Sequence, residues 1–130
     1  MLLPSLPAIQ QGNIKALAGC ITLIENQASG SLDLLKELPV SRTPVIGITG
    51  PPGVGKSSLV NALTGTFLKQ QKKIAILCID PSSPFHRGAL LGDRIRMNQW
   101  TQHPDVYIRS LASRGSLGGL HPRIFEITDL

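Results

Sequence analysis

The chain has 130 residues, of which 42% are hydrophobic and 16% charged, and its formal net charge is +5. This length and composition predict one globular domain with a buried core and exclude an intrinsically disordered chain. The charge is uneven, since residues 66–130 carry nine Lys and Arg against five Asp and Glu, which suits either a polyanion or a solvated basic surface.

Cysteine usage and apolar runs indicate the compartment. Cys20 and Cys78 each lie inside an apolar run, without a C-x-x-C pair or a histidine at metal-ligand spacing. They predict buried thiols in a reducing compartment. No apolar run approaches membrane-spanning length, and the N-terminus has no Arg-rich amphipathic pattern. We therefore expect a cytoplasmic protein without a secretory or transit peptide and without a membrane partner.

The first 42 residues predict a helical extension that packs against the rest of the chain. Residues 6–26 carry apolar side chains at three- and four-residue spacing, which is typical of an amphipathic helix. These side chains are Ile14, Leu17, Ala18, Ile21 and Ile24. Residues 30–39 predict a second short helix, with Ser31 as its cap and Pro39 as its stop.

Strands and helices alternate in the remaining residues. The β-branched run at 45–49 predicts a buried strand, and 56–70 a helix with Leu59, Leu63 and Phe67 on one side. The apolar run at 72–80 predicts a strand buried on both faces, 88–100 a helix, and 105–112 a third strand. The fold class is therefore α/β, with a parallel sheet of about three strands.

A glycine-rich motif joins the first strand to its helix. The segment GPPGVGKSS, residues 50–58, matches G-x-x-x-x-G-K-S/T in the required strand-loop-helix context. Small residues let backbone N–H groups surround a phosphate, and the helix directs its positive dipole end at the same anion. The alternative is a glycine-rich turn that only joins two elements. The nucleotide-binding residues that we expect are Gly50, Pro51, Pro52, Gly53, Val54, Gly55, Lys56, Ser57 and Ser58.

The side chains in this motif have distinct expected roles. Lys56 would contact the β- and γ-phosphates, the Ser57 hydroxyl would ligate Mg²⁺, and Ser58 would hydrogen-bond the α-phosphate. Residues 43–130 thus predict a partial P-loop NTPase domain.

Two aspartates follow the second strand. Asp80 ends that strand, so it emerges at the sheet edge where ligands of parallel sheets bind, and a carboxylate there can hold Mg²⁺. Asp93 lies 13 positions later in a segment tethered to the same edge. Alternatively, Asp80 organises a turn before Pro81, and Asp93 forms a surface ion pair with a nearby arginine.

Three sequence segments, in this order and at this spacing, resemble those of one protein family. GPPGVGKSSLVNAL, IDPSSPFHRGALLGDRIRM and VYIRSLASRGSLGGL are similar to the MeaB/ArgK P-loop GTPases, related to the cobalamin type A protein. The resemblance implies GTP and Mg²⁺ as ligands. It also implies a chaperone role for an adenosylcobalamin-dependent methylmalonyl-CoA mutase, or a related acyl-CoA mutase. Among the residues, it implies phosphate and Mg²⁺ binding by Lys56 and Ser57, and a magnesium and switch region at Asp80 and Asp93.

The sequence departs from the family pattern in two places. His86, Arg87 and Gly88 stand where the family has a small residue and two glycines. After GSLGGL the sequence HPRIFEITDL replaces an alanine-rich helix, and the family's Walker B-like segment, N-K-x-D motif and dimerisation arm are not in the sequence. We expect a fragment, a truncated gene product or a frameshifted tail. Homodimerisation, implied for the full-length family, is open for this chain.

Several other residues have no clear catalytic pattern. His86, His103 and His121 lack metal spacing, and we expect them on loop surfaces. Arg109 and Arg114 resemble family positions near the nucleotide or the partner face. An arginine finger is one reading, and a surface or mutase-facing contact is at least as well supported. Trp100 and Tyr107 lack the basic residues of a nucleic-acid platform, so we expect packing roles and no nucleic-acid partner.

Three functions remain from the sequence. The first is a GTPase in which Lys56, Asp80 and Mg²⁺ serve hydrolysis of the γ-phosphate. The second is a small-molecule P-loop kinase in which Asp80 acts on an acceptor hydroxyl. The third is a truncated, non-catalytic remnant that binds nucleotide or a partner at most.

Overall fold

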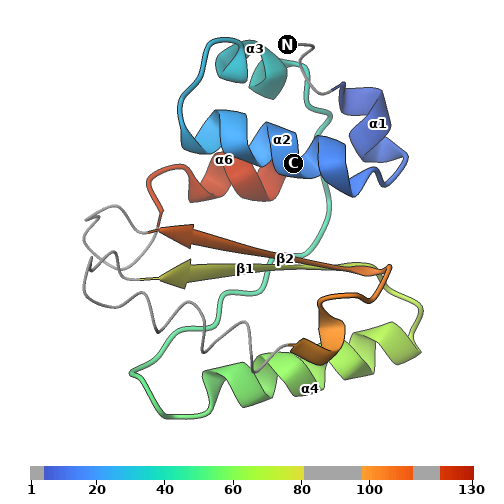
Figure 1. Ribbon diagram of the computed structural model, residues 1–130, viewed down its shortest axis with the longest axis vertical. Helices are drawn as coiled ribbons and strands as arrows, with labels where there is room; N and C mark the ends of the chain where they lie inside the picture. Colours follow the sequence, from blue (N-terminus) through green and yellow to red (C-terminus); the bar gives the residue numbers. More distant parts are fainter. Residues whose placement is uncertain (1–4, 81–97, 113–120) are drawn as a thin grey trace. The chain divides into compact units, whose positions relative to one another are not determined.

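The computed structural model describes residues 5–80, 98–112 and 121–130. These residues belong to two units. One combines Met1–Val45 with Arg123–Leu130, and the other is Ile46–Pro122. Among the described residues, the first unit contains helices and no strand, and the second contains the strands, as Figure 1 shows.

The helical unit is built around one central helix. It consists of α1 (Leu6–Gln10), α2 (Ile14–Glu25), α3 (Ser31–Lys36) and α6 (Ile124–Asp129). Helix α2 contacts each of the other three. Its side chains Cys20, Ile21 and Ile24 are buried, as is Ile127 of α6. The apolar spacing in residues 14–24 therefore identifies a real buried stripe, although Ile14 at its start is 44% exposed.

The helix expected over residues 6–26 is two helices. The break falls at Gly12, whose φ of 81° lies in the left-handed region that ends helices. Asn13 then begins α2, because its side chain accepts a hydrogen bond from the Ala16 N–H at 3.0 Å. Helix α3 also differs from expectation, since Gly30 is its N-cap and Ser31 its first residue.

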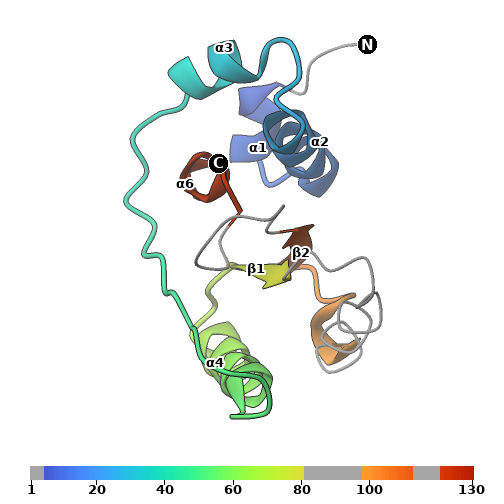
Figure 2. The same cartoon turned by 90° about the vertical axis from the view of Figure 1, so that its left-hand side faces the viewer.

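In its described residues, the strand-containing unit has one α-helix and a two-stranded parallel sheet. Helix α4 spans Lys56–Lys69, strand β1 Ile74–Asp80, the 3₁₀ turn η1 Asn98–Trp100 and strand β2 Val106–Ala112. Strands β1 and β2 pair in parallel from Ile74↔Val106 to Asp80↔Ala112. Figure 2 shows the pair nearly end-on. The predicted α/β class with a parallel sheet is confirmed.

The prediction of a first strand at residues 45–49 is wrong. Residues 45–49 are not in a strand, and Val45 and Ile46 are 67% and 62% exposed. A strand is stable only when its backbone groups pair with a neighbour, and no described residue pairs with this segment. The β-branched composition indicates the propensity for a strand but does not supply the partner.

The second strand is less buried than predicted. Its apolar run suggested burial on both faces, yet Ile74 and residues 76–79 are half-buried and Ala75 is exposed. A strand with one pairing neighbour lacks the surrounding layers that bury both faces. The helix predicted over 88–100 lies outside the described residues except for η1, and the domain boundary at residues 42 and 43 stays a prediction.

Two further expectations concern membrane spans and cysteines. Among the described residues, no helix has the length and apolar character needed to cross a membrane. Neither cysteine forms a disulfide within the described part of the chain. Cys20 is buried as predicted, whereas Cys78 on β1 is only half-buried.

Candidate phosphate-binding site

The loop before α4 contains two glycines in the left-handed backbone region. Gly53 and Gly55 have φ values of 80° and 97°, a region that residues with a Cβ rarely adopt. A Cβ at either glycine would meet no atom within 4 Å, so backbone conformation and not crowding requires glycine here. All residues from 51 to 55 are exposed, which leaves the loop open to a ligand.

Helix α4 supplies the positive end of a helix dipole to this loop. Its N-cap is Gly55, which has no side chain to satisfy the N–H groups of the first turn. In an α-helix these first N–H groups have no partner within the helix, and they carry partial positive charge. An anion beside residues 55–58 therefore meets several donors at once.

The Lys56 side chain folds back onto the loop that precedes it. Its Nζ donates hydrogen bonds to the Gly50 carbonyl oxygen at 2.5 Å and to the Pro51 carbonyl oxygen at 2.8 Å. A lysine ammonium has three donors and is strongly attracted to phosphate oxygens. The structure thus brings the predicted phosphate-binding lysine to the predicted loop.

The residues present are compatible with Mg²⁺-nucleotide. Ser57, in the first turn of α4, is half-buried, and Ser58 beside it is exposed. A hydroxyl in this turn is a suitable oxygen ligand for Mg²⁺, which binds few protein groups and keeps several waters. The loop glycines, the helix terminus and Lys56 provide the phosphate contacts.

The two aspartates are only partly described. Asp80 is the last residue of β1, opposite Ala112 of β2, so the prediction that it ends the strand is confirmed. The Asp80 side chain and the whole of Asp93 lie outside the described residues, so their metal roles stay predictions. Among the residues that the structure describes, no cluster of three His, Cys, Asp or Glu side chains could hold a metal ion.

The histidine expectations have mixed outcomes. His103 is half-buried in a turn, where its Nδ1 accepts a hydrogen bond from the Asp105 N–H at 3.1 Å. His121 lies in a loop as expected but is only 2% exposed, so the prediction of a surface position is wrong. A following proline restricts the backbone of a residue and does not determine whether its side chain is buried. His86 lies outside the described residues.

The remaining predictions concern arginines and aromatic residues. Arg109 is half-buried on β2, and Arg114 lies outside the described residues. Tyr107 on β2 and Trp100 on η1 are both half-buried, which agrees with packing roles.

Sequence reasoning missed one side-chain cluster on α4. The Oδ1 atom of Asn61 accepts hydrogen bonds from Gln99 Nε2 and from Trp100 Nε1, both on η1. These residues lie 38 and 39 positions from Asn61 in the sequence. A half-buried tryptophan N–H needs an acceptor, but no sequence pattern says which residue provides it.

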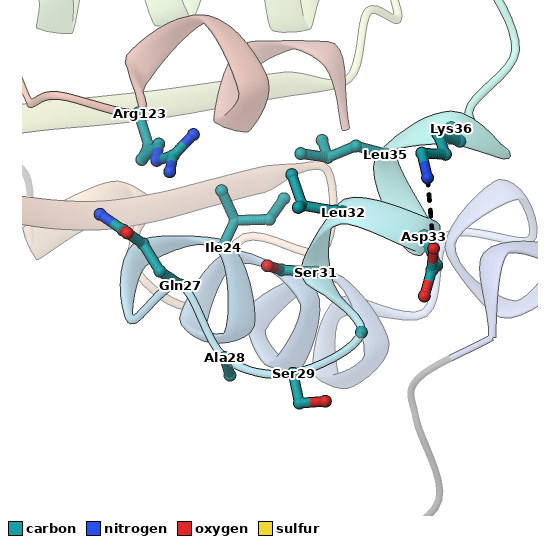
Figure 3. Close-up of a pocket in the computed structure, with 11 residues that line it drawn as sticks. Ile24, Gln27, Ala28, Ser29, Ser31, Leu32, Asp33, Leu35, Lys36 and Arg123 are labelled. Atoms are coloured by element: carbon teal, nitrogen blue, oxygen red, sulfur yellow. Dashed lines mark ion pairs between the residues drawn. The ribbon is translucent and has the colours of Figure 1, made fainter.

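A separate pocket lies in the helical unit. It has a volume of about 350 Å³, between the α2–α3 turn and the start of α6. Figure 3 shows Ile24, Ser31 and Arg123 around it, with Lys36 paired to Asp33 at 3.6 Å. Arg123 is itself paired with Glu126 at 3.0 Å. This pocket contains none of the predicted nucleotide-binding residues.

The chain is similar in sequence to known proteins over most of its length. Residues 17–130 match the family described as Methylmalonyl Co-A mutase-associated GTPase MeaB. A relative from Pyrococcus horikoshii, named as a GTPase, is 45% identical over 86% of this chain and 36% of its own length. Fused isobutyryl-CoA mutase of Geobacillus kaustophilus is 44% identical over 92% of this chain and 12% of its own length.

GTPase ArgK of Escherichia coli is a further relative. It is 33% identical over 97% of this chain and 40% of its own length. The chain therefore spans well under half the length of these relatives. Because the family match covers most of the chain and includes the whole phosphate loop, the chain belongs to the MeaB family of GTPases associated with methylmalonyl-CoA mutase.

Proposed function

We propose that this chain binds the phosphates of Mg²⁺-GTP at residues 50–58. We further propose that it is the phosphate-binding part of a GTPase that acts as a chaperone for an adenosylcobalamin-dependent acyl-CoA mutase. The observation that carries the nucleotide proposal is the joint geometry of Gly53, Gly55 and Lys56. Two left-handed glycines lead directly into a helix whose first side chain reaches back over the loop.

The side chains of the loop have separate tasks in this proposal. Lys56 exchanges its carbonyl contacts for phosphate oxygens, so its positive charge offsets charge that develops on the γ-phosphate during hydrolysis. The first-turn N–H groups of α4 bind and orient the phosphates. Ser57 holds the metal, and a bound Mg²⁺ would neutralise negative charge on the β- and γ-phosphate oxygens. Asp80, at the end of β1, is proposed as a further metal-binding and catalytic group.

The mutase partner is proposed on different grounds. The family description names a methylmalonyl-CoA mutase, and one relative carries a mutase in its own name. The proposed partner is therefore methylmalonyl-CoA mutase or a related acyl-CoA mutase. Homodimerisation of the longer family proteins and cytoplasmic location are likewise proposals.

Nucleotide selection tests the proposed function against the kinase alternative. Mg²⁺-GTP and Mg²⁺-ATP are titrated separately into the purified 130-residue chain by calorimetry. We expect Mg²⁺-GTP to bind, because residues 50–58 supply the proposed phosphate contacts. Tighter ATP binding would favour the kinase, and binding of neither would contradict the nucleotide proposal for this chain.

The mutase proposal has its own experiment. The chain is mixed with a purified methylmalonyl-CoA mutase and analysed by size-exclusion chromatography, with and without Mg²⁺-GTP. We expect co-elution, and serum albumin in place of the mutase serves as the control. Separate elution under both conditions would contradict a mutase-binding role for this part of the protein.

A further inference from the structure

The Asn61 cluster lies one helical turn from the phosphate loop. We define it as Asn61, Gly65, Gln99 and Trp100. Asn61 follows Ser57 by four residues on α4, which is about 6 Å along a helix axis. Residues at this spacing lie on the same face of a helix, so Asn61 is rigidly connected to the turn that holds Ser57.

Asn61 accepts a hydrogen bond from the indole N–H of Trp100, the single tryptophan of the chain. Its Oδ1 accepts the Trp100 Nε1–H and a Gln99 Nε2–H together. An amide oxygen has two lone pairs, so these two donors fill its accepting capacity. Trp100 is half-buried and its indole nitrogen is only a donor, so loss of this acceptor leaves a desolvated N–H.

Gly65 lies against the indole of Trp100. A Cβ added at Gly65 would lie 3.6 Å from Cζ2 and Cη2 of Trp100, so the ring packs directly over this glycine. Asn61 and Gly65 are again four residues apart, so the polar and the apolar contacts with η1 come from the same face of α4. Figure 1 shows η1 beside α4.

The 3₁₀ turn η1, which carries Trp100, is connected to the sheet by backbone hydrogen bonds. The His103 N–H donates to the Trp100 carbonyl at 3.0 Å, and the Val106 N–H donates to the His103 carbonyl at 3.1 Å. The Ile74 N–H then donates to the Asp105 carbonyl at 2.8 Å, which connects the starts of β2 and β1. Hydrogen bonds and the short backbone segments between them thus connect α4 through η1 to the starts of both strands.

We propose that Asn61 is a positioning residue that couples phosphate binding at residues 50–58 to the environment of Trp100. Phosphate contacts at the first turn of α4 shift that helix, and the two Asn61 hydrogen bonds pass the shift to η1. The inference rests on the proposed nucleotide binding, and it adds a residue that acts through α4 without touching the ligand. Because the chain has one tryptophan, its fluorescence reports the environment of Trp100, which includes the Asn61 contact and the nearby His103 ring.

Two variants of Asn61 separate coupling from folding. Asn61→Ala removes the acceptor and keeps a strong helix former, whereas Asn61→Asp keeps an oxygen at the same place. In the ligand-free chains, we expect red-shifted emission and at least twofold greater acrylamide quenching in Asn61→Ala, and wild-type behaviour in Asn61→Asp. Circular dichroism checks the fold, and Asn61→Leu, which is similar in size and also lacks the acceptor, replaces the alanine variant if that one is unfolded.

Nucleotide titration then tests the coupling itself. In the wild type and in Asn61→Asp, Mg²⁺-GTP should change Trp100 emission with the same midpoint that calorimetry gives for binding. In Asn61→Ala, binding should persist within about threefold while the emission change is lost. A residue with a merely structural role is not expected to abolish the emission change while nucleotide binding is retained.

The following outcomes would contradict the proposal, and each identifies the step that fails. Binding without any change in wild-type emission, or an unchanged response in Asn61→Ala, overturns the coupling and leaves the proposed function intact. Unaltered emission of ligand-free Asn61→Ala shows that the contact does not form in solution. Absence of nucleotide binding by the wild type in calorimetry overturns the proposed function and the coupling with it.

Discussion

Glycine is required in the phosphate loop for its backbone conformation. Gly53 has a φ of 80° and open space around it, whereas Gly47 has equally open space and no positive φ. We expect Gly53→Ala to weaken Mg²⁺-GTP binding about tenfold, because an L-residue in the left-handed region costs roughly 1–2 kcal/mol. Gly47→Ala is the matched control and should bind as the wild type does. Equal binding by both variants, measured by calorimetry, would contradict the loop geometry.

The two cysteines differ in burial and therefore in reactivity. Cys20 has 0% exposure, and burial raises the pKa of its thiol above the ordinary value of 9.0. At pH 8 we expect iodoacetamide to alkylate the half-buried Cys78 at least tenfold faster than Cys20, because the thiolate is the nucleophile. Mass spectrometry of each single Cys→Ser variant measures the two rates. Faster alkylation of Cys20 would show that α2 is not packed as described.

The same raised pKa gives a dependence of stability on pH. Because the folded state favours the neutral thiol, the contribution of Cys20 to stability is present below the unfolded pKa and is lost as pH rises through the folded pKa. Cys20→Ala should therefore remove part of the fall in melting temperature between pH 8 and pH 10. An unchanged fall in that variant would contradict burial of the thiol.

Helix α4 contains a glycine whose replacement should be stabilising. Gly65 lies in the helix interior, and an alanine Cβ would make an ordinary contact with Trp100 at 3.6 Å. We expect Gly65→Ala to raise the free energy of unfolding by about 0.5–1 kcal/mol, since alanine loses less backbone entropy in a helix than glycine does. Urea denaturation followed by circular dichroism measures this. A destabilised variant would indicate that the indole lies closer to α4 than the structure shows.

Elements with strong local signals were predictable from the sequence. Helix α4 was expected at 56–70 and spans Lys56–Lys69, and β2 was expected at 105–112 and spans Val106–Ala112. Each has a clear periodic or apolar pattern bounded by turn residues. The break between α1 and α2 was not predicted, because Gly12 and Asn13 sit inside an otherwise helical apolar pattern.

The phosphate loop was predictable from the sequence for similar reasons, whereas the hydrogen bonds of Asn61 were not. The loop motif is contiguous, so its spacing alone places Lys56 near Gly50. The hydrogen bonds of Asn61 join residues almost 40 positions apart, and such contacts depend on the tertiary arrangement of α4 and η1. Local sequence patterns carry no information about pairs of this kind.

At the scale of the whole molecule, the unpaired segment 45–49 is the main departure from a complete parallel sheet. The described part of the chain offers it no pairing strand, and Val45 and Ile46 are largely exposed. We expect backbone amides of residues 45–49 to exchange with deuterium at least 100-fold faster than those of β1 and β2, because exchange is slowed by stable hydrogen bonds. Mass spectrometry of peptic fragments measures this. Equal protection of the three segments would show that residues 45–49 pair in solution.

The central claim is that residues 50–58 of this chain form a working phosphate site. Calorimetric titration of Mg²⁺-GTP into the wild type, Lys56→Ala and Lys69→Ala tests it most directly. Lys69 is a suitable control because it lies at the other end of α4, in its last turn. We predict that Lys56→Ala weakens binding by about 10- to 100-fold, or about 1.4–2.8 kcal/mol, while Lys69→Ala binds as the wild type does. Equal binding by the wild type and Lys56→Ala would contradict the claim.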